Sequence, residues 1–129
     1  MKRIVCLIFL LGLILSGCTQ VSTIETENTY YQISQDEAKS MMDAQSVIIL
    51  DVREQHEYDE AHISNAVLLP LGSINEESAA SIIPNKEFIV LVYCRSGNRS
   101  KQASQKLVDL GYTAVYEFGG INTWDYEVE

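Results

Sequence analysis

The amino-acid sequence predicts an α/β fold in which a mostly parallel central sheet is flanked by helices on both faces. From residue 30 onwards, short strand-like runs alternate with helix-like stretches, the order expected of a parallel sheet with crossover helices. The runs 47–52 and 88–93 are almost continuously apolar and rich in β-branched residues, as expected of central strands covered on both sides. With 129 residues, the chain has the length of one domain rather than two.

Local signals place the first elements. Residues 30–33 are expected to form a short strand. Ser34 and Glu37 have the spacing of a capping box, which predicts a helix that begins there and runs to about Asp43. The run 47–52 is then the first central strand.

The middle of the chain is more polar. Residues 54–60 are expected to form a short polar helix or a turn, and residues 66–69 a second short strand that ends at Pro70. A helix is expected over residues 73–82, and the Pro-Asn pair at 84–85 breaks it.

The most hydrophobic run, 88–93, leads directly into Cys94. A helix is predicted from Gly97 to about Leu110, and Gly111 is expected to close it. Its buried face is marked by Ala103, Leu107 and Leu110. The elements expected after it are a strand over 113–116, a turn at Gly119-Gly120 and a helical piece over 121–126 with Trp124 as a packing residue.

Residues 1–17 have the features of a bacterial lipoprotein signal peptide. Lys2 and Arg3 precede an apolar run, 4–15, that is too short to span a bilayer comfortably. The small residues that follow lead into Cys18, in a pattern that resembles the lipobox, where a signal peptidase cuts before a lipid-modified cysteine. A buried N-terminal helix or an uncleaved signal anchor is the other interpretation.

Export predicts a division of the chain into three parts. Residues 1–17 are removed, the polar stretch 18–29 is a flexible tether, and residues 30–129 are the folded domain. Acyl chains such as palmitate on Cys18 would anchor the protein at the extracytoplasmic face of a bacterial membrane without a spanning helix.

The charge of the exported part argues against a nucleic-acid partner. Removing Lys2 and Arg3 leaves 18 acidic and 7 basic residues, a net charge of −11. Nucleic-acid binders collect their bases on one face, whereas only Arg95, Arg99 and Lys101 cluster here. Such a local cluster is suited to a small anion. A monomer is the default expectation.

Cys94 is the candidate nucleophile. The chain has three cysteines, of which Cys6 and Cys18 belong to the leader and its end, so Cys94 is the one thiol expected in the folded part. It stands between a buried strand and a helix start, where backbone N–H groups and the helix dipole favour an anion and lower the pKa of a thiol. The competing interpretation is a small, inert, buried thiol.

Three segments resemble the rhodanese family. The loop Cys94-Arg95-Ser96-Gly97-Asn98-Arg99-Ser100 is similar to its C-x-x-G-x-R-S pattern. The segment 50–54, with Tyr58 and His62-Ile63, resembles D-V-R…E-[FY]…G-H-I, although Ala61 and Asn65 stand where the family usually has Gly. The segment 118–121 with Trp124 resembles G-G-[IV]-x-x-W.

The resemblance, which spans residues 33–126, implies a rhodanese-like three-layer fold and a sulfurtransferase. Cys94 would take sulfur as a persulfide from an anionic donor such as thiosulfate and pass it to a thiol or to cyanide. The backbone of residues 95–99 would bind the anion, with Arg95 and Arg99 attracting the donor and Ser96, Gly97 and Asn98 completing the loop. No metal and no organic cofactor is implied.

Other functions remain open. The domain could be a non-catalytic sulfur carrier or binding module, and an inert interaction domain would usually lack the cysteine. Cys-dependent phosphatases and arsenate reductases are disfavoured, because a C-x-x-x-x-x-R loop would need its arginine at position 100 and not at Arg99.

Two further groups of residues are given structural interpretations. Asp51 and Arg53 lie near the expected site and could contact the substrate, but they are expected mainly to support the fold, with Arg53 paired to Glu54 or Glu57. His56 and His62 lack the partner spacing of a zinc site.

Overall fold

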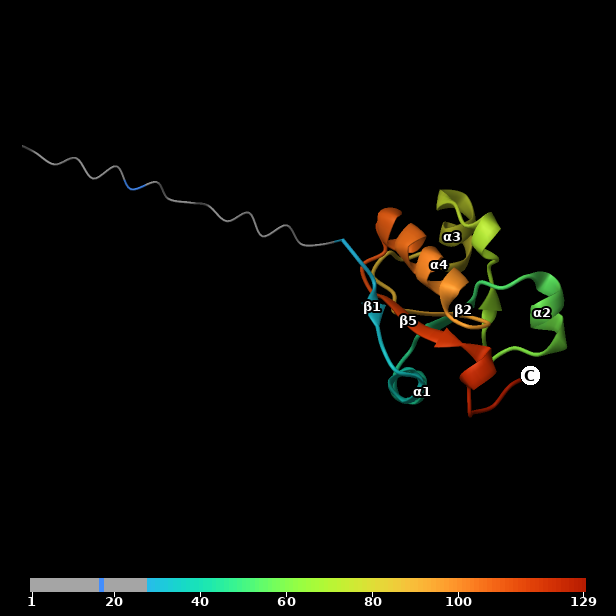
Figure 1. Ribbon diagram of the computed structural model, residues 1–129. Coiled ribbons are helices and arrows are strands. Elements are labelled where there is room, and N and C mark those ends of the chain that lie inside the picture. Colours follow the sequence, from blue (N-terminus) through green and yellow to red (C-terminus); the bar gives the residue numbers. More distant parts are fainter. Residues whose placement is uncertain (1–16, 18–27) are drawn as a thin grey trace, which may run out of the picture.

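The structure, a computed structural model, describes residue 17 and residues 28–129, which form a five-stranded sheet with the strand order β1-β5-β4-β2-β3 (Figure 1). The central strand β4, Val90–Cys94, is buried throughout and lies between β2, Ile48–Asp51, and β5, Val115–Gly120. The edge strands are β1, Tyr31–Gln32, and β3, Val67–Leu68. All four strand pairings are parallel, so the predicted α/β sheet is confirmed.

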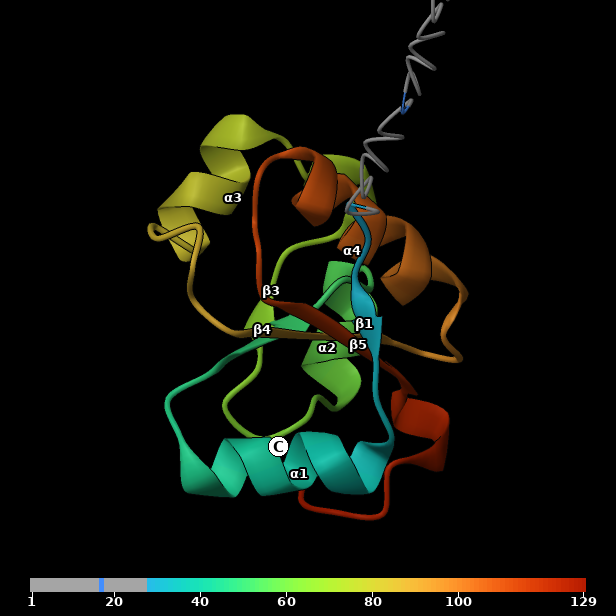
Figure 2. The same cartoon turned by 90° about the vertical axis from the view of Figure 1, so that its left-hand side faces the viewer.

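Helices cover both faces of the sheet, as predicted. Helix α1, Gln35–Ala44, lies on one side of the strands, and α3, Glu76–Ile82, and α4, Asn98–Asp109, lie on the other (Figure 2). Successive side chains of a strand point to opposite faces, so β4 contributes to two cores. Val90, Val92 and Cys94 enter the core shared with α3 and α4, and Leu91 and Tyr93 enter the core shared with α1.

The predicted helix signals act as expected. The Ser34 hydroxyl accepts the Glu37 N–H at 3.1 Å, and the Glu37 carboxylate accepts the Ser34 N–H at 2.8 Å, which completes the capping box. Helix α2, Gln55–Glu60, confirms the short polar helix. Gly111 ends α4 with φ +98°, the left-handed conformation that glycine adopts without cost.

Helix α3 begins later than predicted. Asn75 caps it by accepting the Ser78 N–H at 2.9 Å, so the helix starts at Glu76 and not at residue 73. The residues before the cap form a separate 3-10 turn, Leu71–Ser73.

The predicted end of the last strand is wrong. The expected strand over 113–116 is β5, Val115–Gly120, which runs through the expected turn, because Gly120 pairs with Cys94 across a register shift after Val92. Pairing in the sheet satisfies backbone groups that a turn there would leave buried. Only a 3-10 turn, Ile121–Thr123, follows in place of the longer helical piece.

The two departures from the family glycines fit the loop. Ala61 is extended, with φ −168°. Asn65 has φ +68°, in the left-handed region where asparagine is among the better tolerated residues after glycine.

The predicted signal peptide up to residue 16, most of the tether and Cys18 lie outside the described residues, and the division of the chain stays a prediction. Between residues 28 and 129, no helix is both long enough and apolar enough to cross a membrane.

Candidate active site

Cys94 lies at the carboxyl end of β4, where parallel α/β sheets place their ligands. Residues 95–97 turn the chain sharply, and α4 begins at Asn98. The residue is 1% exposed, so its thiol lies at the bottom of the loop. Among the described residues it is the free cysteine.

The loop gives the Cys94 sulfur several hydrogen-bond partners. The Gly97 N–H donates to Sγ at 3.0 Å, and the Ser100 hydroxyl lies 3.4 Å from Sγ. Burial raises the pKa of the thiol, but the Ser100 hydroxyl and the backbone N–H groups of Ser100, Gly97 and Ser96 outweigh burial and lower it. The site therefore favours a thiolate, the form in which a cysteine is a nucleophile.

Two glycines shape this loop. Gly97 has φ +109°, a conformation that side-chain-bearing residues rarely adopt. Gly120 lies directly behind the loop, and a Cβ atom on it would lie 2.0 Å from the Arg95 carbonyl oxygen and 2.5 Å from the Ser96 nitrogen. In the sequence, Gly120 is recognised only as part of the G-G-[IV]-x-x-W motif. Its contact with the loop backbone follows from the pairing of β5 with β4, which the motif does not indicate.

For the sulfur transfer from thiosulfate that the family resemblance implies, we expect Gly120→Ala to lower kcat/KM by about 100-fold, because the added methyl group must displace the loop around Cys94. Steady-state thiocyanate formation measures this loss. Gly72→Ala is the matched control, since a Cβ there meets nothing within 4 Å. Equal rates in the two variants would contradict this account of Gly120.

The four predicted loop side chains differ in their surroundings. Arg95, Ser96 and Asn98 are exposed around the loop mouth. Arg99, which is predicted to attract the anionic donor, also has a partner that the sequence did not indicate, because its guanidinium donates to both carboxylate oxygens of Glu57 in α2, at 2.6 and 2.8 Å. That pair partly neutralises Arg99 and joins α2 to the start of α4.

Glu57 should make the fold sensitive to acid. Its hydrogen bonds to Arg99 lower its pKa from 4.5 to about 2. Because the folded pKa is depressed, the stabilisation is complete above about pH 4.5 and is lost as the pH falls toward 2. Because solvent screens this partly exposed pair, we expect it to contribute about 1–2 kcal/mol to the free energy of unfolding.

Urea unfolding of the wild type and of Glu57→Gln at several pH values measures this effect. The difference in unfolding free energy should be largest near pH 7 and should shrink below pH 4. The side-chain amide oxygen of the Glu57→Gln variant can still accept the Glu54 N–H, which Glu57 accepts at 3.0 Å, so the helix start is preserved. A difference that does not change with pH would exclude ionisation as its origin.

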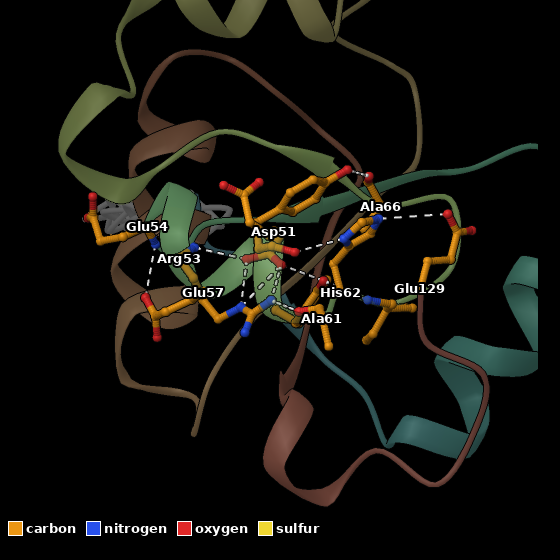
Figure 3. A network of polar contacts seen from close by, with 12 residues as sticks. Asp51, Arg53, Glu54, Glu57, Ala61, His62, Ala66 and Glu129 are labelled. Atoms are coloured by element: carbon orange, nitrogen blue, oxygen red, sulfur yellow. Dashed lines mark hydrogen bonds and ion pairs between the residues drawn. The ribbon is translucent and has the colours of Figure 1, made fainter.

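Asp51 and Arg53 form a buried ion pair beside the site (Figure 3). The prediction that Arg53 pairs with Glu54 or Glu57 is wrong. The Arg53 guanidinium donates to the Asp51 carboxylate at 2.7–3.1 Å and to the Ala61 carbonyl at 2.7 Å. The Tyr93 hydroxyl also donates to Asp51 at 2.5 Å. Asp51 is fully buried, so water cannot solvate its carboxylate, and the hydrogen bonds from Arg53 and Tyr93 compensate for that loss.

Ser100 and Glu117 were missed as a pair. Ser100 is fully buried, Glu117 is 3% exposed, and the Ser100 hydroxyl donates to Glu117 Oε1 at 2.6 Å. In the sequence, Ser100 is recognised only as the last residue of the loop motif. Glu117 was missed because the strand was expected to end at residue 116, which left this carboxyl outside the sheet.

The open pockets on the described part of the domain include two of several hundred cubic ångströms. One, of about 450 Å³, runs along the loop backbone and is lined by Ser96, Gly97 and Lys101 together with Glu117. The other, of about 380 Å³, lies between α1 and the C-terminal segment and touches none of the loop residues. The first pocket is therefore the one that belongs to the site.

Comparisons with known proteins agree with this geometry. Residues 34–127 match the family model described as a rhodanese-like domain. The chain is 41% identical over 96 residues to thiosulfate sulfurtransferase GlpE of Coxiella burnetii, covering 74% of this chain and 87% of that protein. It is 38% identical over 72 residues to thiosulfate sulfurtransferase PspE of Escherichia coli, covering 56% of this chain and 68% of that protein.

A solved structure shares the fold. A rhodanese from E. coli with bound anions superposes with a TM-score of 0.61 at 32% identity, covering 65% of this chain and 98% of that one.

Proposed function

The chain belongs to the rhodanese-like domain family, and on that premise we propose that it is a sulfurtransferase that carries sulfane sulfur on Cys94. The observation that carries the proposal is the hydrogen bonding of the Cys94 sulfur at the bottom of the loop, where the Gly97 N–H donates to it at 3.0 Å. A structural cysteine has no need of such donors. Thiosulfate is proposed as the donor because the relatives named above are thiosulfate sulfurtransferases.

The reaction has two steps. The Cys94 thiolate attacks the outer sulfur of thiosulfate, a bond forms between Sγ and that sulfur, and sulfite leaves with the electron pair of the broken S–S bond. A thiol or cyanide then attacks the outer sulfur of the persulfide and releases the thiolate. The N–H groups of the loop stabilise the anionic sulfur in both steps.

Arg95 supplies most of the attraction for the donor. Its side chain is exposed at the loop mouth, whereas the charge of Arg99 is held by Glu57. A thiosulfate dianion is attracted over several ångströms by an unneutralised guanidinium.

The test uses the full-length protein in detergent. After incubation with thiosulfate, peptide mass mapping should find one added sulfur on the Cys94 peptide, and cyanide should remove it as thiocyanate. An adduct that forms once without turnover would assign the domain as a sulfur carrier. No adduct on reduced Cys94 would exclude both functions, and hydrolysis of an aryl phosphate would indicate a phosphatase.

We further propose that the domain works at the outer face of a bacterial membrane, anchored by lipid on Cys18. The support is the sequence: a basic start, a short apolar run, small residues and then Cys18. Labelled palmitate supplied to an expressing bacterium should enter the wild type and Cys6→Ala but not Cys18→Ala. Equal labelling of Cys18→Ala would exclude this anchor.

A further inference from the structure

Glu117 is a buried carboxylate directly behind the sulfur-binding loop. Alternation along β5 places it on the same face as Val115, toward α4. Its Oε1 accepts the Ser100 hydroxyl at 2.6 Å and the Gly119 N–H at 2.8 Å, and its Oε2 accepts Gln32 Nε2 at 3.4 Å. All three contacts are donors, as an ionised carboxylate requires, and none is a cation.

Charged groups around Glu117 are few. In the part of the chain that the structure describes, Glu117 forms no salt bridge. Strand β1 faces it with the neutral Gln32, β4 contributes Cys94, and α4 contributes Ser100. Lys101 is the one other ionisable residue that lines the adjacent pocket, and it is exposed to solvent, which screens its charge.

One hydroxyl joins Glu117 to the nucleophile. Ser100 Oγ lies 2.6 Å from Glu117 Oε1 and 3.4 Å from Cys94 Sγ. A serine hydroxyl has a single proton to donate. The Glu117 carboxylate and the Gly97 carbonyl oxygen, 2.9 Å from Ser100 Oγ, compete with the Cys94 thiolate for that proton. Donated to the thiolate, the proton lowers the pKa of Cys94. Held by Glu117, the nearest acceptor, it leaves Ser100 with a lone pair toward Cys94, which suits a thiol S–H donor.

We propose that Glu117 is a positioning residue that restrains Cys94 from losing its proton, by competing for the Ser100 hydroxyl and by adding a like charge nearby. The loop N–H groups and the nearby Arg99 charge, which Glu57 partly neutralises, favour the thiolate, and Glu117 opposes them. Two neighbouring anions in a buried site disfavour each other, so ionisation of Cys94 is shifted to higher pH than the loop alone would give.

The restraint has a consequence for sulfur transfer, and this part rests on the proposed function. A persulfide carries its negative charge on the outer sulfur, one bond farther from Glu117 than Sγ. Repulsion by Glu117 therefore destabilises the bare thiolate more than the loaded persulfide. A thiolate that is harder to form is also the stronger nucleophile toward the donor and the poorer leaving group toward the acceptor.

The test measures the pH dependence of Cys94 alkylation by iodoacetamide, a neutral reagent that requires no sulfurtransferase activity. Glu117→Gln keeps an oxygen that can accept from Ser100 and Gly119 but removes the charge. Its alkylation midpoint should lie about one pH unit below that of the wild type. Below both midpoints, alkylation should be about three- to tenfold faster than in the wild type, the thiolate gain being offset in part by weaker nucleophilicity.

Two further variants make the result decisive. Glu117→Met fills similar space without charge and should shift the midpoint in the same direction. Glu87 is exposed and precedes the start of β4, at the end of the strand opposite Cys94. Glu87→Gln removes this distant carboxylate and should leave the alkylation midpoint unchanged. A midpoint that stays or rises in both Glu117 variants would overturn the proposal, whether or not thiosulfate loads Cys94.

Discussion

Cys94→Ser is expected to reduce thiocyanate formation from thiosulfate and cyanide by at least about 1,000-fold, because a serine hydroxyl cannot form a persulfide and is a far weaker nucleophile. Serine nearly preserves the size of the side chain and can still accept the Gly97 N–H that Cys94 accepts at 3.0 Å. The thermal unfolding midpoint should therefore change little.

The other two cysteines provide the controls. In unprocessed protein that retains residues 1–17, Cys6→Ala and Cys18→Ala should keep turnover in detergent, and mass mapping should place no sulfur on Cys6 or Cys18 of the unprocessed wild type. Turnover in Cys94→Ser within tenfold of the wild type would show that another group carries the sulfur.

Asp51→Asn is expected to destabilise the fold by about 3–5 kcal/mol, the largest effect on stability that we foresee. Asp51 is completely buried, at 0% exposure, and Arg53 is 5% exposed. Removing the carboxylate charge leaves the guanidinium buried with the Ala61 carbonyl, 2.7 Å away, as its remaining strong acceptor. Urea unfolding at pH 7 measures the loss.

Two comparisons separate the ion pair from general disruption. Tyr93→Phe removes only the hydroxyl that donates to Asp51 and accepts the Ile63 N–H, and it should cost about 1–3 kcal/mol. The double variant Asp51→Leu with Arg53→Met should be more stable than the sum of its single variants predicts, since no charge is then left unpaired. Additive losses would contradict a coupled pair.

The prediction succeeded where neighbouring residues determine structure. Ser34 and Glu37 are three positions apart and cap α1 without help from the rest of the chain. The apolar run that ends at Cys94 is the buried strand β4. The predicted start of α3 was wrong because Asn75 was not recognised as its cap. The predicted end of β5 was wrong because Gly119-Gly120 has the composition of a turn.

In the site, too, contacts between residues close in the chain were predicted and contacts between distant residues were not. Cys94, the loop 95–99 and the left-handed Gly97 follow one another in the chain, and their pattern was sufficient to predict an anion-binding loop. Partners that lie far apart in the chain were not foreseen: Glu57 is 42 positions from Arg99, and Glu117 is 17 from Ser100. Composition gives no sign of which acid faces which base.

The sequence by itself thus determined the fold class and the place of Cys94 and its loop between a buried strand and a helix, because these depend on the order and periodicity of adjacent residues. Only the tertiary structure decided which distant residues lie around Cys94 and its loop. Parallel pairing of β4 with β5 brings Gly120 against the loop and Glu117 behind Ser100. Those contacts arise from strand register and burial, which are set when the sheet assembles and not by any local pattern.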